Sequence, residues 1–131
     1  MLYKSNSFYS SAQELRDSGF LCPSAHLAYY SVFIILKYIV CNYLGINYEV
    51  QDEEHSGDMS HKDIIEKVID DVDAKNPGLS FDLERYINAM KQLRVKADYK
   101  DEEIDEPSIV RHLTNAQNVY DIVKTLYGIP I

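Results

Sequence analysis

The amino-acid sequence predicts an all-α protein, folded as an antiparallel up-and-down helical bundle in a single domain over residues 1–131. The chain has 131 residues, a length that suits one compact domain. Five segments carry apolar residues three and four positions apart, as on one face of a helix, and no segment alternates as a strand does. Most connections between these segments are short, which favours antiparallel neighbours.

The first two predicted helices cover residues 5–18 and 23–44. Gly19 marks the end of the first helix. Pro23 suits the first position of the second, where its missing N–H would have had no partner, and Gly45 suits its C-terminal cap. Apolar residues cover nearly every side of the second helix, so we expect it at the centre of the bundle.

Residues 27–44 resemble a membrane-spanning helix in length and apolar content. They also include Lys37 near the middle, together with Ser31, Asn42 and four tyrosines. A lysine at the centre of a membrane helix costs about 2.5–3.5 kcal/mol on insertion. We therefore interpret the segment as a buried core helix and expect no membrane association.

A polar stretch, residues 46–59, separates the second helix from the third and is long for a bundle connection. The third helix is predicted to open at Ser60, because Ser60 and Asp63 resemble a capping box, in which each side chain satisfies the other's free backbone N–H. The turn residues Asn76-Pro77-Gly78 are predicted to end this helix.

The fourth and fifth predicted helices cover residues 80–99 and 107–127, and the fifth has two apolar edges. One edge contains Ile109, Leu113, Ala116, Tyr120, Val123 and Tyr127, and the other contains Val119, Ile122 and Leu126. A helix with two apolar edges needs two partners, and we expect one of them to come from a second subunit. The 11 tyrosines also favour an interface, so the sequence predicts a homodimer.

Charge and cysteine content limit the partners and the compartment. The net charge is -8, which disfavours non-specific binding to nucleic acid. The acidic residues gather in residues 52–58 and 101–106, which we interpret as solvated loops. Cys22 and Cys41 lie about 28 Å apart along one predicted helix, too far for a disulfide. Free thiols, and an N-terminus without a signal-peptide core, favour a cytoplasmic protein.

Arg94 is the exception on the apolar stripe of the fourth helix. It follows Met90 by four positions and Ile87 by seven, which places the guanidinium on or beside the apolar face. Asp98 lies one turn further on, within reach of Arg94, and we expect the Tyr99 hydroxyl to donate into the same network. Two interpretations stay open: these residues fix the end of the bundle, or they form a functional cluster.

The run Ala25-His26-Leu27-Ala28-Tyr29-Tyr30-Ser31-Val32-Phe33 resembles the paired-aromatic second helix of the HEPN superfamily. His61 matches the histidine that these proteins typically carry at the start of a third helix. An R-x-x-A-D-Y signature is matched by Arg94, Ala97, Asp98 and Tyr99. The resemblance implies a four-helix up-and-down core with one additional helix, commonly a dimer. We take Arg94, Asp98, Tyr99 and His61 as the candidate functional cluster.

The same resemblance bears on enzyme activity. Ribonucleases of the superfamily carry an Arg and a His separated by four to six residues, which together assist attack of an RNA 2′-hydroxyl on its own phosphate. After Arg94 the permitted positions hold Tyr99, Lys100 and Asp101, and Arg16, Arg85 and Arg111 also lack such a histidine. The chemistry needs a proton shuttle that titrates near neutral pH. We therefore assign no catalytic residue and place the chain in the non-catalytic R-x-x-A-D-Y branch.

No cofactor or metal site is predicted. His55 and His61 flank acidic residues, but their spacing matches no helical pair of metal ligands. His26 and His112 stand alone in the sequence, and we interpret each as packed or exposed rather than catalytic. No glycine-rich loop that would cradle a phosphate is present.

Three functions stay open from the sequence. The first, which we favour, is a non-catalytic module that dimerises and pairs with a small nucleotidyltransferase encoded nearby, as in toxin–antitoxin pairs; the resemblance implies this partner. The second is an RNA-binding protein or ribonuclease with a degraded site around Arg94 and Tyr99. The third is a small-ligand or nucleotide-binding bundle with a pocket between its helices.

Overall fold

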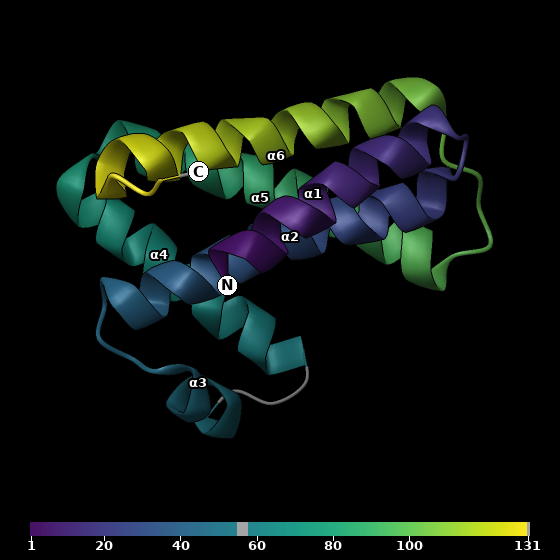
Figure 1. Ribbon diagram of the computed structural model, residues 1–131. Helices are drawn as coiled ribbons and strands as arrows, with labels where there is room; N and C mark the ends of the chain where they lie inside the picture. The colour runs from purple at the N-terminus through teal and green to yellow at the C-terminus, as the bar shows by residue number, and fades with distance from the viewer. Residues whose placement is uncertain (55–57, 131) are drawn as a thin grey trace.

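Helices make up the fold, as the sequence predicts (Figure 1). The computed structural model describes residues 1–54 and 58–130, with the side chains of residues 52–54 and 58–60 left out. In this part of the chain the helices are α1 (Leu2–Asp17), α2 (Leu21–Asn42), α3 (Tyr48–Glu54), α4 (Asp58–Lys75), α5 (Pro77–Tyr99) and α6 (Glu106–Tyr127). No strand occurs among the described residues, and the all-α prediction is confirmed.

The second long helix, α2, occupies the centre of the bundle and contacts α1, α4, α5 and α6 (Figure 1). Its side chains Ile35, Leu36 and Ile39 are fully enclosed. Burying one such side chain contributes about 1.5–3 kcal/mol, so contact on several sides holds the helix in place. By length and composition alone α2 could cross a membrane, but 67 % of its most apolar stretch is buried inside the fold.

Side-chain caps fix where α5 and α6 begin. The Asn76 side chain accepts a hydrogen bond from the Leu79 backbone N–H at 3.2 Å, and Pro77 is the first residue of α5. The turn that ends α4 therefore also starts α5, three residues before the predicted position. The Asp105 side chain likewise accepts a hydrogen bond from the Ser108 backbone N–H at 2.8 Å at the start of α6.

The polar stretch between α2 and α4 differs from the prediction. It contains the short helix α3, and α4 begins at Asp58, so Ser60 lies inside the first turn of α4 and the predicted capping position is wrong. Gln51 anchors α3: it is 1 % exposed, and its Nε2 donates to the carbonyls of Lys37 at 3.2 Å and Ile46 at 2.8 Å. A side-chain amide thus holds the segment against the end of α2.

Buried hydroxyl groups connect α1 and α6 to α2. The Ser5 hydroxyl donates to the Ser31 carbonyl at 2.7 Å, and the Tyr120 hydroxyl lies 2.5 Å from Ser5 Oγ. Further along, the Ser24 hydroxyl donates to the Ala12 carbonyl at 2.7 Å. Leaving a buried polar group unpaired costs about 1–3 kcal/mol, so these bonds fix how α1 and α6 are rotated against α2.

Within one chain α6 buries its first apolar edge almost completely and its second edge in part. The helix packs against α2 and α5, Val119 is fully buried, and Ile122 and Leu126 pack against the core. Ile122 and Leu126 remain partly exposed, so contact between this edge and a second subunit stays a prediction. The homodimer prediction also depends on the family resemblance and on exposed aromatic side chains.

Candidate functional site

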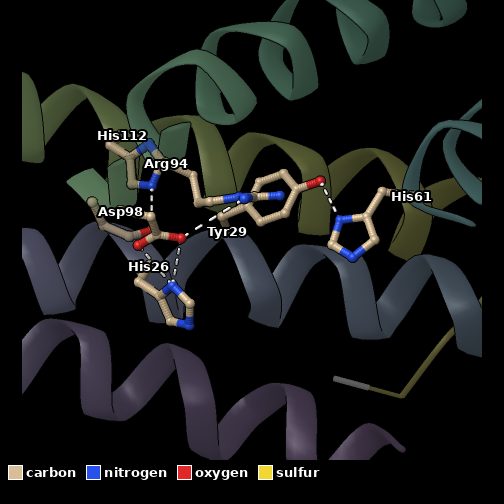
Figure 2. Close-up of polar contacts among 7 residues, drawn as sticks. His26, Tyr29, His61, Arg94, Asp98 and His112 are labelled. Atoms are coloured by element: carbon tan, nitrogen blue, oxygen red, sulfur yellow. Dashed lines mark hydrogen bonds and ion pairs between the residues drawn. The ribbon is translucent and has the colours of Figure 1, made fainter. Parts of the chain in front are cut away.

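Arg94, near the C-terminal end of α5, points into the bundle. Only 4 % of the residue is exposed. Its guanidinium carbon lies 4.9 Å from the ring centre of Tyr29 and 5.7 Å from that of Tyr30, both on α2. A cation at these distances is attracted to an aromatic ring. Figure 2 shows the guanidinium lying alongside the Tyr29 ring.

Asp98, one helical turn after Arg94, carries the compensating charge. Its Oδ2 lies 3.8 Å from Arg94 Nη1, and the side chains of Asp98 and Arg94 are 18 % and 5 % exposed. Burial by itself would lower the pKa of Arg94. The oxygens of Tyr30 and Tyr29 and the Asp98 carboxylate outweigh that effect, so the pKa of Arg94 lies above its ordinary value. Arg94 therefore stays charged and needs the carboxylate beside it.

His26, on α2, joins this cluster, which the sequence did not suggest. Its Nδ1 lies 2.9 Å from both carboxylate oxygens of Asp98, and its ring centre is 4.6 Å from that of Tyr30. The carboxylate accepts from Nδ1–H and leaves the Nε2 lone pair free of this bond. His26 and Asp98 are 72 residues apart in the chain, so no local spacing predicts their contact. The one indication in the sequence is that His26 precedes the paired tyrosines by three residues.

His61, in the first turns of α4, is linked to Arg94 through Tyr29. The Tyr29 hydroxyl lies 3.1 Å from His61 Nδ1, and the His61 ring stacks on Phe33 with centres 4.1 Å apart. Figure 2 shows the Tyr29 side chain between Arg94 and His61. The structure thus places His61, Arg94 and Asp98 in one connected row, with Tyr29 and His26 as further members.

Tyr99 lies at the edge of the cluster and is 69 % exposed. Its ring centre is 5.8 Å from the Arg94 guanidinium carbon. The described contact is therefore made by the ring, whereas we had expected the hydroxyl to donate a hydrogen bond. Tyr99 also borders a groove of about 530 Å³ between the first turns of α2 and the last turn of α5, which we call the α2–α5 groove. Its lining consists of Cys22, Pro23, His26, Ala97, Asp98 and Tyr99.

His112, on α6, is a third histidine and lies next to the cluster (Figure 2). It is 2 % exposed, and its Nε2 donates to the Ala25 carbonyl at 2.9 Å. Burial lowers the pKa of His112 from 6.5 to about 4, so the ring is neutral at neutral pH. Its role is to hold α6 against α2.

A family model described as the HEPN domain matches residues 1–126. The chain belongs to the HEPN family. No curated protein and no solved structure matches it. The HEPN match includes every residue on which the resemblance was based: residues 25–33, His61 and the R-x-x-A-D-Y signature.

In this HEPN domain Arg94, the arginine of the signature, is buried and makes its contacts inside the fold. Asp98 compensates its charge, and the rings of Tyr29 and Tyr30 lie against its guanidinium. The most exposed side chains beside it belong to His26, whose side chain is 43 % exposed, and to Tyr99, a residue that is 69 % exposed. His55, one of the two histidines considered for a metal, lies outside the described residues.

Proposed function

We propose that this HEPN domain is a non-catalytic interaction module. It assembles as a homodimer and acts with a nucleotidyltransferase partner, in a cytoplasmic toxin–antitoxin or defence-type pair. The observation that carries the proposal is the internal position of Arg94, which is 4 % exposed. A ribonuclease of this family would need to direct an arginine at the RNA phosphate.

The surroundings of Arg94 argue against the RNA-binding and ribonuclease alternatives. Moving the guanidinium outward to a phosphate would separate it from Asp98 and from the ring of Tyr29. Both contacts stabilise the charge in a place where water cannot. The net charge of -8 adds long-range repulsion between the domain and a nucleic-acid backbone.

Exposed aromatic side chains offer a surface for partners. Phe20, directly before α2, is 58 % exposed, and Tyr99, at the end of α5, is 69 % exposed. Tyr99 lines the α2–α5 groove, and Phe20 directly precedes the first turn of α2, which forms the other side of the groove. Aromatic residues are enriched in protein interfaces, where they bury a large area at a small cost in conformational entropy. We therefore assign the partner-binding surface to the groove and its rim.

We expect the purified protein to leave labelled single-stranded RNA intact in the absence of divalent metal ions. No His follows an Arg at the required interval, and Arg94 is buried. Gel electrophoresis of the RNA after incubation measures the result. The partly exposed Arg16 supplies a control, Arg16→Ala. Cleavage that is lost in a folded Arg94→Ala variant but kept in Arg16→Ala would overturn the proposal and restore the ribonuclease alternative.

Assembly is the second test. Light scattering coupled to gel filtration is expected to give twice the chain mass of 15.1 kDa at micromolar concentration. Adding the proposed partner, a small nucleotidyltransferase, is expected to increase this mass. A monomer mass at that concentration would contradict the homodimer, and an unchanged mass after addition would contradict the partner.

A matched pair of variants locates the partner surface. Tyr99 and Phe81 are 69 % and 70 % exposed and lie at opposite ends of α5. Tyr99→Ala is expected to weaken partner binding about tenfold, a loss of about 1.4 kcal/mol, while Phe81→Ala leaves it unchanged. Equal losses in the two variants would show that the groove is not the binding surface.

A further inference from the structure

A cavity between α5 and α6 is lined by a buried histidine and by several other polar side chains. Its volume is about 150 Å³, and we call it the α5–α6 cavity. Its lining consists of Ala89 and Leu93 from α5 and of Ser108, Arg111, His112 and Asn115 from α6. The α2–α5 groove has a different lining, and the interaction role proposed above makes no use of this cavity.

His112 carries an unused hydrogen-bond acceptor. The residue is 2 % exposed, and its Nε2 donates to the Ala25 carbonyl on α2 at 2.9 Å. The ring is neutral at neutral pH because burial lowers its pKa to about 4, so Nδ1 keeps a lone pair. The two ring nitrogens face in widely different directions, so this lone pair points away from the Ala25 carbonyl. No described residue donates a hydrogen bond to it.

This nitrogen is not sealed from solvent. Within the part of the chain that the structure describes, two side-chain atoms are both fully buried and without a partner: Gln51 Oε1 and Arg94 Nε. Nδ1 of His112 also lacks a protein partner but is not one of these atoms, so it keeps some contact with solvent. Since His112 lines the α5–α6 cavity, a molecule in this cavity can reach the nitrogen.

Arg111 brings a positive charge to the same cavity. The other arginines each lie within ion-pair distance of an aspartate: Arg16, Arg85 and Arg94. Arg111 has no such carboxylate among the described residues, and its guanidinium donates to the Ser108 hydroxyl at 3.3 Å. The Asp105 carboxylate senses this charge but accepts its hydrogen bond from the Ser108 backbone N–H. Arg111 therefore keeps most of its N–H donors for an anion.

We propose that the α5–α6 cavity binds a small 2-hydroxycarboxylate. The carboxylate lies against the Arg111 guanidinium, and the hydroxyl on the neighbouring carbon donates to Nδ1 of His112. The Asn115 amide, which has no protein partner within residues 1–54 and 58–130, donates to the second carboxylate oxygen. The carbon chain of the ligand packs on Ala89 and Leu93.

The size and the polarity of the cavity select this class of ligand. A cavity of about 150 Å³ holds a molecule of the size of benzene, and lactate is of that size. A carboxylate without a hydroxyl would leave Nδ1 of His112 without a donor. The ammonium group of an amino acid carries three N–H donors, and a neutral imidazole accepts a single hydrogen bond. A hydroxyl group, with a single donor, therefore fits His112 better.

Nuclear magnetic resonance of the full chain tests the site. Protein labelled with nitrogen-15 is titrated with sodium lactate at neutral pH, and the Nδ1 resonance of His112 is followed. It is expected to move toward the position of a hydrogen-bonded nitrogen and to saturate with a Kd on the order of 1 mM. Sodium propionate, which keeps the carboxylate but lacks the hydroxyl, is the matched control. Backbone signals from the cavity are expected to show that propionate binds about tenfold more weakly and leaves Nδ1 unshifted.

A pair of variants tests the role of Arg111. Arg111→Gln is expected to weaken lactate binding at least about tenfold, while Arg85→Gln, at an exposed arginine on α5, leaves it unchanged. An Nδ1 resonance that stays in place at tens of millimolar lactate overturns the proposal without any variant. Equal affinities for lactate and propionate, or equal losses in the two variants, also overturn it. The titration needs no partner protein, so its result is independent of the interaction role.

Discussion

Replacing Asp98 with alanine is expected to lower the free energy of unfolding by about 3–5 kcal/mol. The Arg94 side chain is 5 % exposed and lies 3.8 Å from the Asp98 carboxylate, so the variant leaves a buried guanidinium without its counter-charge. His26 loses its hydrogen-bond acceptor at the same time. Equilibrium unfolding in urea, followed by circular dichroism, measures the loss.

Asp101→Ala is the matched control for this variant. Asp101 is an exposed carboxylate two residues beyond α5, and its replacement is expected to change the unfolding free energy by less than about 0.5 kcal/mol. The comparison also separates the two interpretations of the cluster. If Asp98→Ala costs less than about 1 kcal/mol but weakens partner binding, the cluster is mainly a recognition site and does not fix the bundle.

Acidification from pH 6.5 to about pH 4 is expected to remove about 3 kcal/mol of stability through His112. The unfolded ring takes up a proton near pH 6.5. The folded ring does so only near pH 4, because burial disfavours its charged form. Between these values the unfolded state binds a proton that the folded state does not, so stability falls as pH falls. Above pH 6.5 the contribution is fully present, and below pH 4 this group causes no further loss.

A His112→Gln variant tests this assignment, because a glutamine amide can donate to the Ala25 carbonyl and does not titrate. Unfolding free energies of both proteins at intervals between pH 7 and pH 4 are expected to converge as the pH falls. The pKa values of Asp71 and Asp105 are lowered below 3.8, so their contributions are lost mainly near and below that pH. Parallel curves for the two proteins would contradict the role given to His112.

The long helices could be predicted because their signals are local. Apolar spacing and the turn residues placed five of them to within a few residues. The short helix α3 escaped prediction since its seven residues give little periodicity, and its anchor at Gln51 depends on two carbonyls that only the fold brings together. At Ser60 a local pattern gave a wrong prediction. The sequence there resembles a capping box, but α4 already begins at Asp58.

Residue spacing predicted the candidate site only where the site follows one helix, and His61, on α4, was included through the family resemblance. Arg94 and Asp98 lie one turn apart on α5, so their proximity could be read from the sequence. His26 meets Asp98 only because α2 lies against α5, and this alignment depends on packing over the whole bundle. The outward position of Tyr99 likewise depends on where α5 ends relative to α2. The contact between His26 and Asp98 therefore became visible only in the structure.

The hydroxyl link between Ser5 and Tyr120 joins two residues that the ribosome makes at widely separated times. The ribosome makes α1 and α2 first, so Ser5 can reach the Ser31 carbonyl early. Tyr120 follows Ser5 by 115 residues, a delay of about 6–23 s at the usual elongation rates of about 5–20 residues per second. Once α2 is complete at Asn42, the α1–α2 hairpin waits for the rest of that time with the surface that α6 will cover exposed to water. Exposed apolar surface of this kind makes an unfinished chain prone to aggregation.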